Sequence, residues 1–522
     1  MRDRARGRAA SGMALPARGP GEVTGEGSAV SRLSAGQPAD PTRPAPTRTH
    51  GQQLRLLATV VSAWALAAVA GAPAGGSLAA GACEPRSSDQ ITRILAAGPH
   101  AGDCERCHTE HGSGQTPQLY ALVGPDDNAL CDRCHTGSWT TASYPGTWTY
   151  AGSAHGSSPS TIWPGLTPPA RVEANAAGKC VNCHDPHGWQ DDSGEITHLG
   201  VAREEAACLT CHDGSPATTN VRAEFLKPFR HPTTDFSGRH TGPEESSASD
   251  FGTSPLNRRH AECEDCHNPH VARSDPPLGH PAPSPSLTVL GVSRVLVENG
   301  PAGAAPAYTF VAGSDTMSGP PEEYQLCMKC HSSWTTQPPG QTDLGRALNP
   351  ANPSYHPVEA IGANPNIQPD AFAAGWSALS RTGCGDCHGS DFESVAGPHG
   401  SAYRYILRSP YTASPAPRAM APGEACFSCH AYDVYANSSS SDAVLGASRF
   451  NRPGAVKGHV EHVGQLSVPC YSCHATHGST DLEFLLVRGR WPGITAYTKT
   501  PTGGTCTATC HGAKSYTANY AR

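Results

Sequence analysis

Apolar residues occur in a few short clusters along this chain, separated by long polar stretches. The longest cluster is Leu56–Ala70. Five shorter clusters follow: Leu119–Val123, Ile196–Val201, Leu287–Val292, Tyr403–Leu407 and Phe484–Val487. The segments between them are rich in Pro, Gly, Ser and Thr, as in Pro276–Pro285, a composition that favours turns and loops. We therefore expect short helices, a few short strands and long loops.

The longest cluster has the layout of a secretory signal. Arg55 precedes it and small residues ending in Ala80-Gly81-Ala82 follow it, the order of basic flank, apolar stretch and A-x-A site that marks a cleaved signal. The cluster is short for a membrane span, and nothing nearby would pack on it as a buried helix. We predict that 1–82 is a disordered leader plus the signal, and that 83–99 is a linker. The mature chain is expected in the periplasm, on the outer-membrane surface or outside the cell.

Cys83 follows this predicted cleavage site directly. It is placed to carry the lipid of a bacterial lipoprotein, although Ala80 stands where Leu is usual. The other interpretation is an incidental free thiol, and the sequence leaves both open.

The composition is too poor in apolar residues for a large conventional core. Only 37% of the residues are hydrophobic, while Gly and Pro number 56 and 48. The chain is therefore either largely disordered or organised around something other than polypeptide. The net charge is −7, and nine Arg against four acidic residues before residue 83 leave about −12 for the remainder. Such an acidic chain is not expected to bind nucleic acid.

Twenty of the 21 cysteines fall into ten copies of one motif. Nine copies read C-x-x-C-H, and the tenth has three residues between its cysteines. The cysteine pairs are Cys104 and Cys107, Cys131 and Cys134, Cys180 and Cys183, Cys208 and Cys211, Cys263 and Cys266, Cys327 and Cys330, Cys384 and Cys387, Cys426 and Cys429, Cys470 and Cys473, and Cys506 and Cys510. The histidines that end the motifs are His108, His135, His184, His212, His267, His331, His388, His430, His474 and His511.

C-x-x-C-H is the attachment signature of haem c. Two thiols one short turn apart can form thioethers to the two vinyl groups on one porphyrin edge, and the following His then aims its imidazole at the iron. Zinc sites also use C-x-x-C pairs but do not require His at the next position every time. A redox dithiol needs one pair rather than ten, and a disulfide framework has no reason to place His after every second Cys. We therefore predict ten covalent haem c groups.

The motifs come in pairs, with one of the five shorter apolar clusters between the members of each pair. Five repeats follow, called units 1 to 5 below. Units 1 and 2 occupy 100–230, unit 3 occupies 231–355, unit 4 occupies 356–455 and unit 5 occupies 456–522. Repeats that cannot bury their own apolar faces favour an extended, quasi-linear arrangement.

Each haem iron needs a second axial ligand, which is Met or His in most electron carriers. After residue 83 there are only three methionines, Met317, Met328 and Met420, and Met328 lies inside a motif. Of the 26 histidines, fifteen remain when His50 and the motif histidines are set aside. We expect bis-His ligation, which keeps the reduction potentials low because Met/His ligation raises them.

The candidate second ligands form two groups. A His three residues past a motif His lies on the same side of that ring, so we expect it to bind a neighbouring iron. This first group is His111, His187, His270 and His477, with His399 as the displaced equivalent in unit 4. The second group lies upstream of each unit: His100, His155, His231, His356 and one of His459 and His462. This leaves His198, His240, His260, His280 and the other of His459 and His462 as surplus.

The paired motifs resemble the doubled CXXCH family of multihaem c-type cytochromes. The resemblance rests on Cys180–Gly188, Cys263–His270 and Cys470–Gly478 and on second members such as Leu326–His331, and it covers nearly everything from His100 to His511. It implies a multihaem cytochrome c fold that is loop-rich, with short helices at the haem motifs, few short strands and an extended array of stacked haem pairs. It also implies bacterial respiration, with other redox proteins, an outer-membrane porin–cytochrome complex or extracellular electron acceptors as partners.

We interpret the chain as an electron carrier and not an enzyme. The alternative is a multihaem oxidoreductase of the nitrite, hydroxylamine or tetrathionate type, which needs one iron with an open face. The C-x-x-C-K motif that some of these enzymes use is absent, and fifteen spare histidines force no open site. A third class, a filament of subunits joined end to end, is compatible with the conduit and stays open.

Overall fold

The computed structural model describes most of the chain after residue 103. The described residues are 104–109, 122–124, 128–135, 150–164, 180–187, 190–191, 194–195, 200, 203–233, 260–275, 286–314, 319–337, 340–392, 394–451 and 458–518. All of them lie in the second of two regions of the chain, Pro85–Arg522. The predicted leader, signal and linker, with Cys83, lie outside them. None of the helices in the described part has the length and apolar character needed to cross a bilayer.

The helices are short, as the loop-rich prediction requires. The α-helices are α2 (Asn128–His135), α3 (Ala154–Ser157), α4 (Glu204–Cys211), α5 (Val221–Glu224), α8 (Glu323–His331), α9 (Leu344–Leu348), α10 (Tyr432–Tyr435) and α11 (Asp442–Leu445). The 3-10 helices are η1 (Cys104–Arg106), η3 (Tyr150–Gly152), η4 (Cys180–Asn182), η7 (Cys263–Asp265), η8 (Leu287–Val289), η9 (Pro369–Ala371), η10 (Cys384–Asp386), η11 (Arg404–Ile406), η12 (Ala425–Ser428) and η14 (Cys470–Ser472). One π-helical segment, η13, spans Val460–Gln465.

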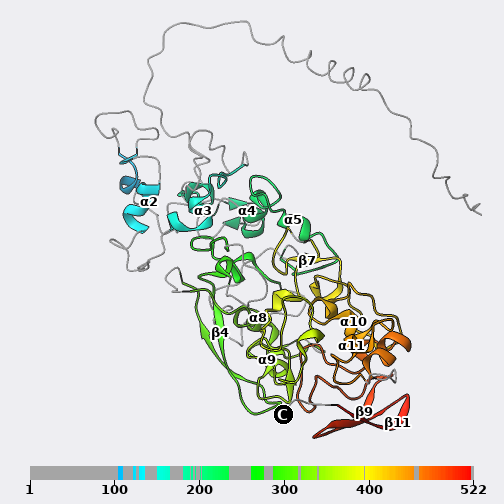
Figure 1. Cartoon of the computed structure of the whole chain (residues 1–522). Helices are drawn as coiled ribbons and strands as arrows, with labels where there is room; N and C mark the ends of the chain where they lie inside the picture. Colours follow the sequence, from blue (N-terminus) through cyan, green and yellow to red (C-terminus); the bar gives the residue numbers. More distant parts are fainter. Residues whose placement is uncertain are drawn as a thin grey trace, which may run out of the picture. The chain divides into compact units, whose positions relative to one another are not determined.

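The strands are equally short and form small antiparallel sheets. They are β1 (Gln190–Asp191), β2 (Gly194–Glu195), β3 (Phe229–Arg230), β4 (Arg294–Glu298), β5 (Ala307–Val311), β6 (Ser354–Tyr355), β7 (Gly400–Ser401), β8 (Gly478–Ser479), β9 (Ile494–Thr500), β10 (Gly503–Ala508) and β11 (His511–Thr517). The pairings are β1–β2, β3–β7, β4–β5 and β6–β8, with β9–β10–β11 as a three-stranded sheet near the C-terminus (Figure 1). The prediction of few, short elements joined by loops is confirmed.

Conventional apolar packing is confined to small clusters. In the largest, Val295 of β4 packs with Met328 of α8, Trp334, Leu348 and Val358. Alternation along β4 turns Val295 inward, where none of its surface is exposed. Met328 is therefore a core residue of unit 3, and Met420 packs in a second cluster. Both methionines therefore have packing roles in the apolar clusters.

Two of the sheets join segments that are far apart in the sequence. β3 pairs with β7 in the register Phe229–Ser401 and Arg230–Gly400. β6 pairs with β8 in the register Ser354–Ser479 and Tyr355–Gly478. β3 lies just before predicted unit 3 and its partner lies in unit 4, while β6 lies just before unit 4 and its partner lies in unit 5. These two sheets therefore join the end of unit 2 to unit 4 and the end of unit 3 to unit 5.

Candidate functional site

Each described C-x-x-C-H motif occupies a single helical turn. First members of the pairs lie in 3-10 helices, and second members lie in α2, α4, α8 and η12. The turn closes because the amide of the motif His donates to the carbonyl of the first Cys, at 2.8 Å in His267 and in His388. Residues three apart on such a turn lie on one side, so the two thiols of a motif face the same way.

The tenth motif departs from this pattern in structure as well as in spacing. Cys506 lies in β10, Cys510 lies in the hairpin turn, and His511 opens β11. The register between β10 and β11 shifts between Cys506 and Ala508. The extra residue is therefore accommodated by a hairpin with an irregular ladder rather than by a helical turn.

In units 3 to 5 the first motif His is oriented by a carbonyl of the apolar cluster that follows it. The Nδ1–O distances are 3.0 Å for His267–Thr288, 2.8 Å for His388–Tyr405 and 2.9 Å for His474–Phe484. Because Nδ1 donates to the carbonyl, Nε2 carries the lone pair that a metal needs. The apolar clusters thus have a second role, as holders of the motif histidines.

Two of these carbonyls, those of Tyr405 and Phe484, belong to residues in the left-handed region of backbone conformation. Tyr405 and Ile406 have φ of 67° and 52°. The carbonyl of Tyr405 accepts from the ring of His388, and the carbonyl of Ile406 accepts from the amide of Gly389 at 2.7 Å. A non-glycine residue in this region costs about 1 kcal/mol or more. Unit 5 repeats the arrangement with Phe484 and Leu485. In both units, therefore, two consecutive residues with positive φ lie where the first motif His is oriented.

Eight motif histidines face a second histidine at a nearly constant separation. The ring-centroid distances are 5.8 Å for His108–His187, 6.0 Å for His184–His270, 6.0 Å for His267–His399, 6.2 Å for His388–His477, 5.9 Å for His212–His155, 6.3 Å for His331–His231, 6.1 Å for His474–His459 and 6.3 Å for His511–His462. Every facing histidine is a candidate second ligand from the sequence.

The first motif His of units 1 to 4 faces a histidine of the following unit. His108 of unit 1 faces His187 of unit 2, and His184 of unit 2 faces His270 of unit 3. The same rule holds for units 3 and 4 through His399 and His477. Of these, His184, His267 and His388 do not face the histidine that follows them in their own unit.

The second motif His of units 2 and 3 faces the upstream histidine of its own unit. These pairs are His212–His155 and His331–His231. In unit 4 the neighbour of His430 is His356, which contributes, after burial, to holding the pKa of His430 at about 4.

The two histidines that face the two motifs of one unit are tied to each other. We call this arrangement the clamp of that unit. In each clamp the ring of the upstream His donates from Nδ1 to the carbonyl just before the His of the following unit. The Nδ1–O distances are 3.2 Å for His155–Pro269, 2.7 Å for His231–Pro398 and 2.6 Å for His356–Thr476. A clamp therefore positions at once the two histidines that face both motifs of a unit.

Unit 5 uses a different device. His459 and His462, at the start of η13, face His474 and His511. The ring of His459 is bonded to Ser448 Oγ at 2.7 Å, and that of His462 to the carbonyl of Gly458 at 2.7 Å. The expectation that one of His459 and His462 is surplus is therefore corrected, since one helix presents both to motif histidines.

Several candidates lie elsewhere. His260 is bonded to Glu262 Oε1 at 3.2 Å and does not face a motif histidine in the described part. The candidates His100 and His111, with His198, His240 and His280, lie outside the described residues.

The family described as Doubled CXXCH motif matches residues 98–138 and 173–217, which hold both motifs of unit 1 and both motifs of unit 2. These two segments of the chain match the doubled CXXCH motif family. The comparisons with curated proteins and with solved structures found no match. The paired CXXCH motifs indicate covalent haem c and a multihaem c-type cytochrome in electron transfer.

The facing histidines fit a haem iron between them. Two metal–nitrogen bonds of roughly 2 Å, with about 1 Å from each nitrogen to its ring centre, put the centroids roughly 6 Å apart. The observed range is 5.8–6.3 Å. Burial also holds the pKa of His331, His399 and His477 at about 4, so these rings are neutral at pH 7, as a metal ligand must be.

The thiols place successive haem motifs next to each other in chain order. Between units, the first Cys of a second motif contacts the first Cys of the next unit: Cys131–Cys180, Cys208–Cys263, Cys327–Cys384 and Cys426–Cys470. Within unit 2, burial and the neighbouring Cys211 raise the pKa of Cys183 to about 11. In unit 5, burial and the neighbouring Cys506 raise the pKa of Cys473 to about 11.

Unit 1 places the second cysteine of each motif at its helical turn. Cys107 and Cys134 are both predicted to bind haem through their sulfur atoms. In the structure Cys107 directly follows η1 and its carbonyl accepts from the amide of Val123 at 2.9 Å, while Cys134 lies one residue before the end of α2. Both side chains are half-buried, and neither forms a disulfide. The two residues occupy the expected places in their motif turns, and their thioether bonds stay a prediction.

The other uses of C-x-x-C pairs can be compared with all the described cysteines. None of the nineteen whose side chains are described forms a disulfide. Within the described ranges, no group of three or more His, Cys, Asp or Glu is arranged to hold a metal ion. The second cysteines of the remaining helical motifs, like Cys107 and Cys134, are unbridged: Cys183, Cys211, Cys266, Cys330, Cys387, Cys429 and Cys473.

Sequence reasoning missed the residues that position the histidines. A Cβ on Gly400 would overlap the carbonyl of Glu224, and one on Gly478 would overlap the carbonyl of Ala347. These glycines directly follow His399 and His477, and they let a second backbone approach each clamp. The His-Gly dipeptide, repeated at His399 and His477, was a sequence signal for these two glycines. The backbone carbonyls of Thr288, Tyr405 and Phe484 have no such signal in the sequence.

Proposed function

We propose that the chain is an electron conduit that carries ten c-type haems, most of them with two axial histidines. The observation that carries this proposal is the set of eight motif histidines that each face a second histidine about 6 Å away, the spacing that one bound iron requires. When bound, haem iron accepts and releases single electrons. The cysteines anchor each group, and the paired histidines hold its iron from both sides.

The contacts between thiols support transfer in chain order. Cys131–Cys180 and its three equivalents join the units, and pairs such as Cys183 and Cys211 lie together within them. Porphyrins tethered to these cysteines would form one file from unit 1 to unit 5, the stacked array predicted from the sequence. Histidine as the second ligand, with Met328 and Met420 packed in the core, supports low potentials.

Location and partners follow from the leader and the charge. The signal pattern before Cys83 supports export to the periplasm or the cell surface. An acidic chain there would exchange electrons with other redox proteins, an outer-membrane porin–cytochrome complex or extracellular acceptors, and copies joined end to end would extend the conduit into a filament. Nucleic acid is not a proposed partner.

The test is a haem count together with the spin state of the iron. The full chain is expressed with haem-maturation machinery, and intact-mass spectrometry of the mature protein is expected to show ten haems. Absorption and EPR spectra are expected to show low-spin iron. Eight or fewer haems would contradict one haem per motif. A five-coordinate high-spin signal in the resting protein would instead favour the multihaem oxidoreductase.

A further inference from the structure

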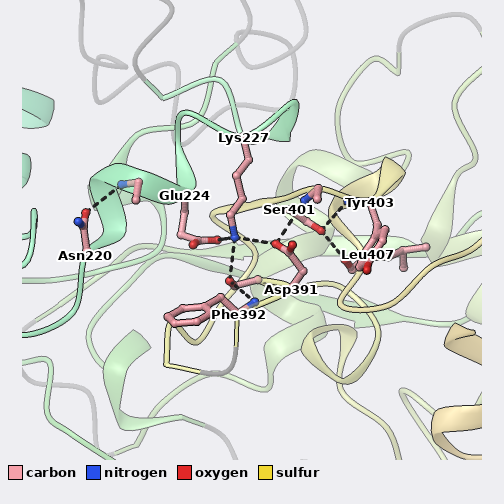
Figure 2. A network of polar contacts seen from close by, with 11 residues as sticks. Asn220, Glu224, Lys227, Asp391, Phe392, Ser401, Tyr403 and Leu407 are labelled. Atoms are coloured by element: carbon pink, nitrogen blue, oxygen red, sulfur yellow. Dashed lines mark hydrogen bonds and ion pairs between the residues drawn. The ribbon is translucent and has the colours of Figure 1, made fainter. Parts of the chain in front are cut away.

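Lys227 lies at the centre of a network that joins α5 to the loop after the first motif of unit 4 (Figure 2). Its Nζ donates to Glu224 Oε2 at 2.7 Å and to Asp391 Oδ1 at 2.6 Å, with Ser390 Oγ at 3.5 Å. Glu224 precedes β3, whereas Asp391 follows His388 by three residues. We call Glu224, Lys227 and Asp391 the ion triad, because one ammonium group bridges carboxylates from two units.

The side chains of the ion triad are largely buried from solvent, so each charge is stabilised mainly by the others. The side chain of Glu224 is 3% exposed, against 22% for Lys227 and 20% for Asp391. Partial burial raises the pKa of Asp391, but hydrogen bonds from Lys227 and the Ala402 amide outweigh this and leave it below the usual value. A buried carboxylate that loses its cation is strongly destabilising, so removing Lys227 would drive Glu224 and Asp391 apart.

The ion triad adjoins the clamp of unit 3. Asp391 Oδ1 also accepts from the amide of Ala402, directly after β7, at 3.3 Å. Continuing the β3–β7 ladder, the amide of His231 donates to the carbonyl of His399 at 3.2 Å. On the other side, the ring of Phe225, beside Glu224, meets the ring of His399 edge-on at 5.8 Å. The ion triad thus fixes both strands from which the clamp histidines project.

We propose that the ion triad is a positioning device for two irons at once, those held by His267 and His331. It acts by keeping His399 and His231 at the distance where each completes the coordination of its iron. This inference rests on the proposed function, because it requires haem bound at both motifs. Lys227 touches neither iron and is a positioning residue.

The clamp of unit 4 provides an internal contrast, because a neutral group on β6 helps to hold it. Ser354 Oγ donates to the carbonyl of Leu482 at 2.7 Å and accepts from the amide of Leu485 at 2.7 Å. Dependence on an ion bridge is therefore a property of the unit 3 clamp. Ser354→Ala should disturb the irons held by His388 and His430 and leave those of unit 3 unchanged.

The test measures carbon monoxide binding to the fully haem-loaded, reduced protein, since CO binds only where a second axial ligand is lost or labile. Lys227→Met is expected to raise binding from almost none to about one to two CO per protein. Its CO-difference and high-spin EPR spectra should match the sum of those from His231→Gly and His399→Gly, which open these irons singly. Lys227→Arg should restore the low-spin state, and Arg346→Met, at an exposed position, should match the parent.

The outcomes separate this inference from the proposed function. A parent protein with fewer haems or high-spin iron would overturn the proposed function itself. A low-spin parent with a Lys227→Met variant that is less stable but binds no CO would overturn the positioning role alone. If Lys227→Met does not accumulate, Asp391→Ala keeps the pair between Lys227 and Glu224 and removes only the bridge to unit 4. It should open the same two irons, and failure to do so in a folded, fully loaded variant would also overturn the inference.

Discussion

Two histidines three residues apart in one motif meet different partners. His184 faces His270, while His187 faces His108 of the preceding unit. The cause is local geometry. The helical turn of the motif closes at His184, so His187 lies past the end of the turn and does not face the partner of His184. The side chain of Asp185 accepts from the amide of His187 at 2.9 Å and fixes that departure. A short spacing in the sequence therefore encodes a contact between units.

His187→Met should alter the iron held by His108 and leave the iron held by His184 unchanged. Methionine in place of the second histidine should raise one reduction potential by on the order of 0.1 V or more. Potentiometric titration followed by EPR measures this change. His260→Met is the matched control, since His260 bonds to Glu262. Loss of the signal from the His184 iron with the others intact would contradict the assignment.

At the scale of elements, two-residue strands bring the clamps together. β3, β6, β7 and β8 are too short to show any alternation of apolar and polar residues, so no periodicity could predict them. Their pairing depends instead on close backbone approach at Gly400 and Gly478. The helical turns at the motifs were predictable, because covalent anchoring demands the same spacing each time.

Gly400→Ala should weaken the β3–β7 ladder. The added methyl would overlap the carbonyl of Glu224, and forced packing of this kind costs about 1–3 kcal/mol. Denaturant titration should show that loss, together with CO binding at the unit 3 irons. Gly423→Ala is the control, because a Cβ there meets nothing within 4 Å. Equal stability of the two variants would show that the ladder can shift without cost.

At the scale of the whole molecule, the described units depend on their neighbours. The first motif His of units 1 to 4 faces a residue from the next unit, and unit 5 supplies both of its own facing histidines from η13. The predicted unit boundaries at 231 and 356 fall directly after β3 and β6, whose partner strands lie in units 4 and 5. Units 1 to 4 therefore cannot complete their own sites.

Acid should destabilise the folded chain as the pH falls from neutral towards 4. Burial holds the pKa of His331, His399 and His477 at about 4, below the ordinary 6.5. Between these values the unfolded chain binds more protons, so the free energy of unfolding is greatest above pH 6.5 and falls as the pH drops towards 4. Denaturant titrations at pH 7 and pH 5 should differ by more than about 1 kcal/mol. Equal midpoints and slopes at both values would contradict this prediction.

The sequence alone determined the chemistry of the sites, because haem attachment is covalent and local. Cys-x-x-Cys-His needs no distant residue to be recognised, and the shortage of methionine pointed to histidine as the second ligand. Only the tertiary structure decided which histidine faces which motif, as with His399 and His267, and which residues hold them there, as with Lys227. Those choices depend on long-range backbone pairing and buried charge, which leave no spacing in the sequence to be read.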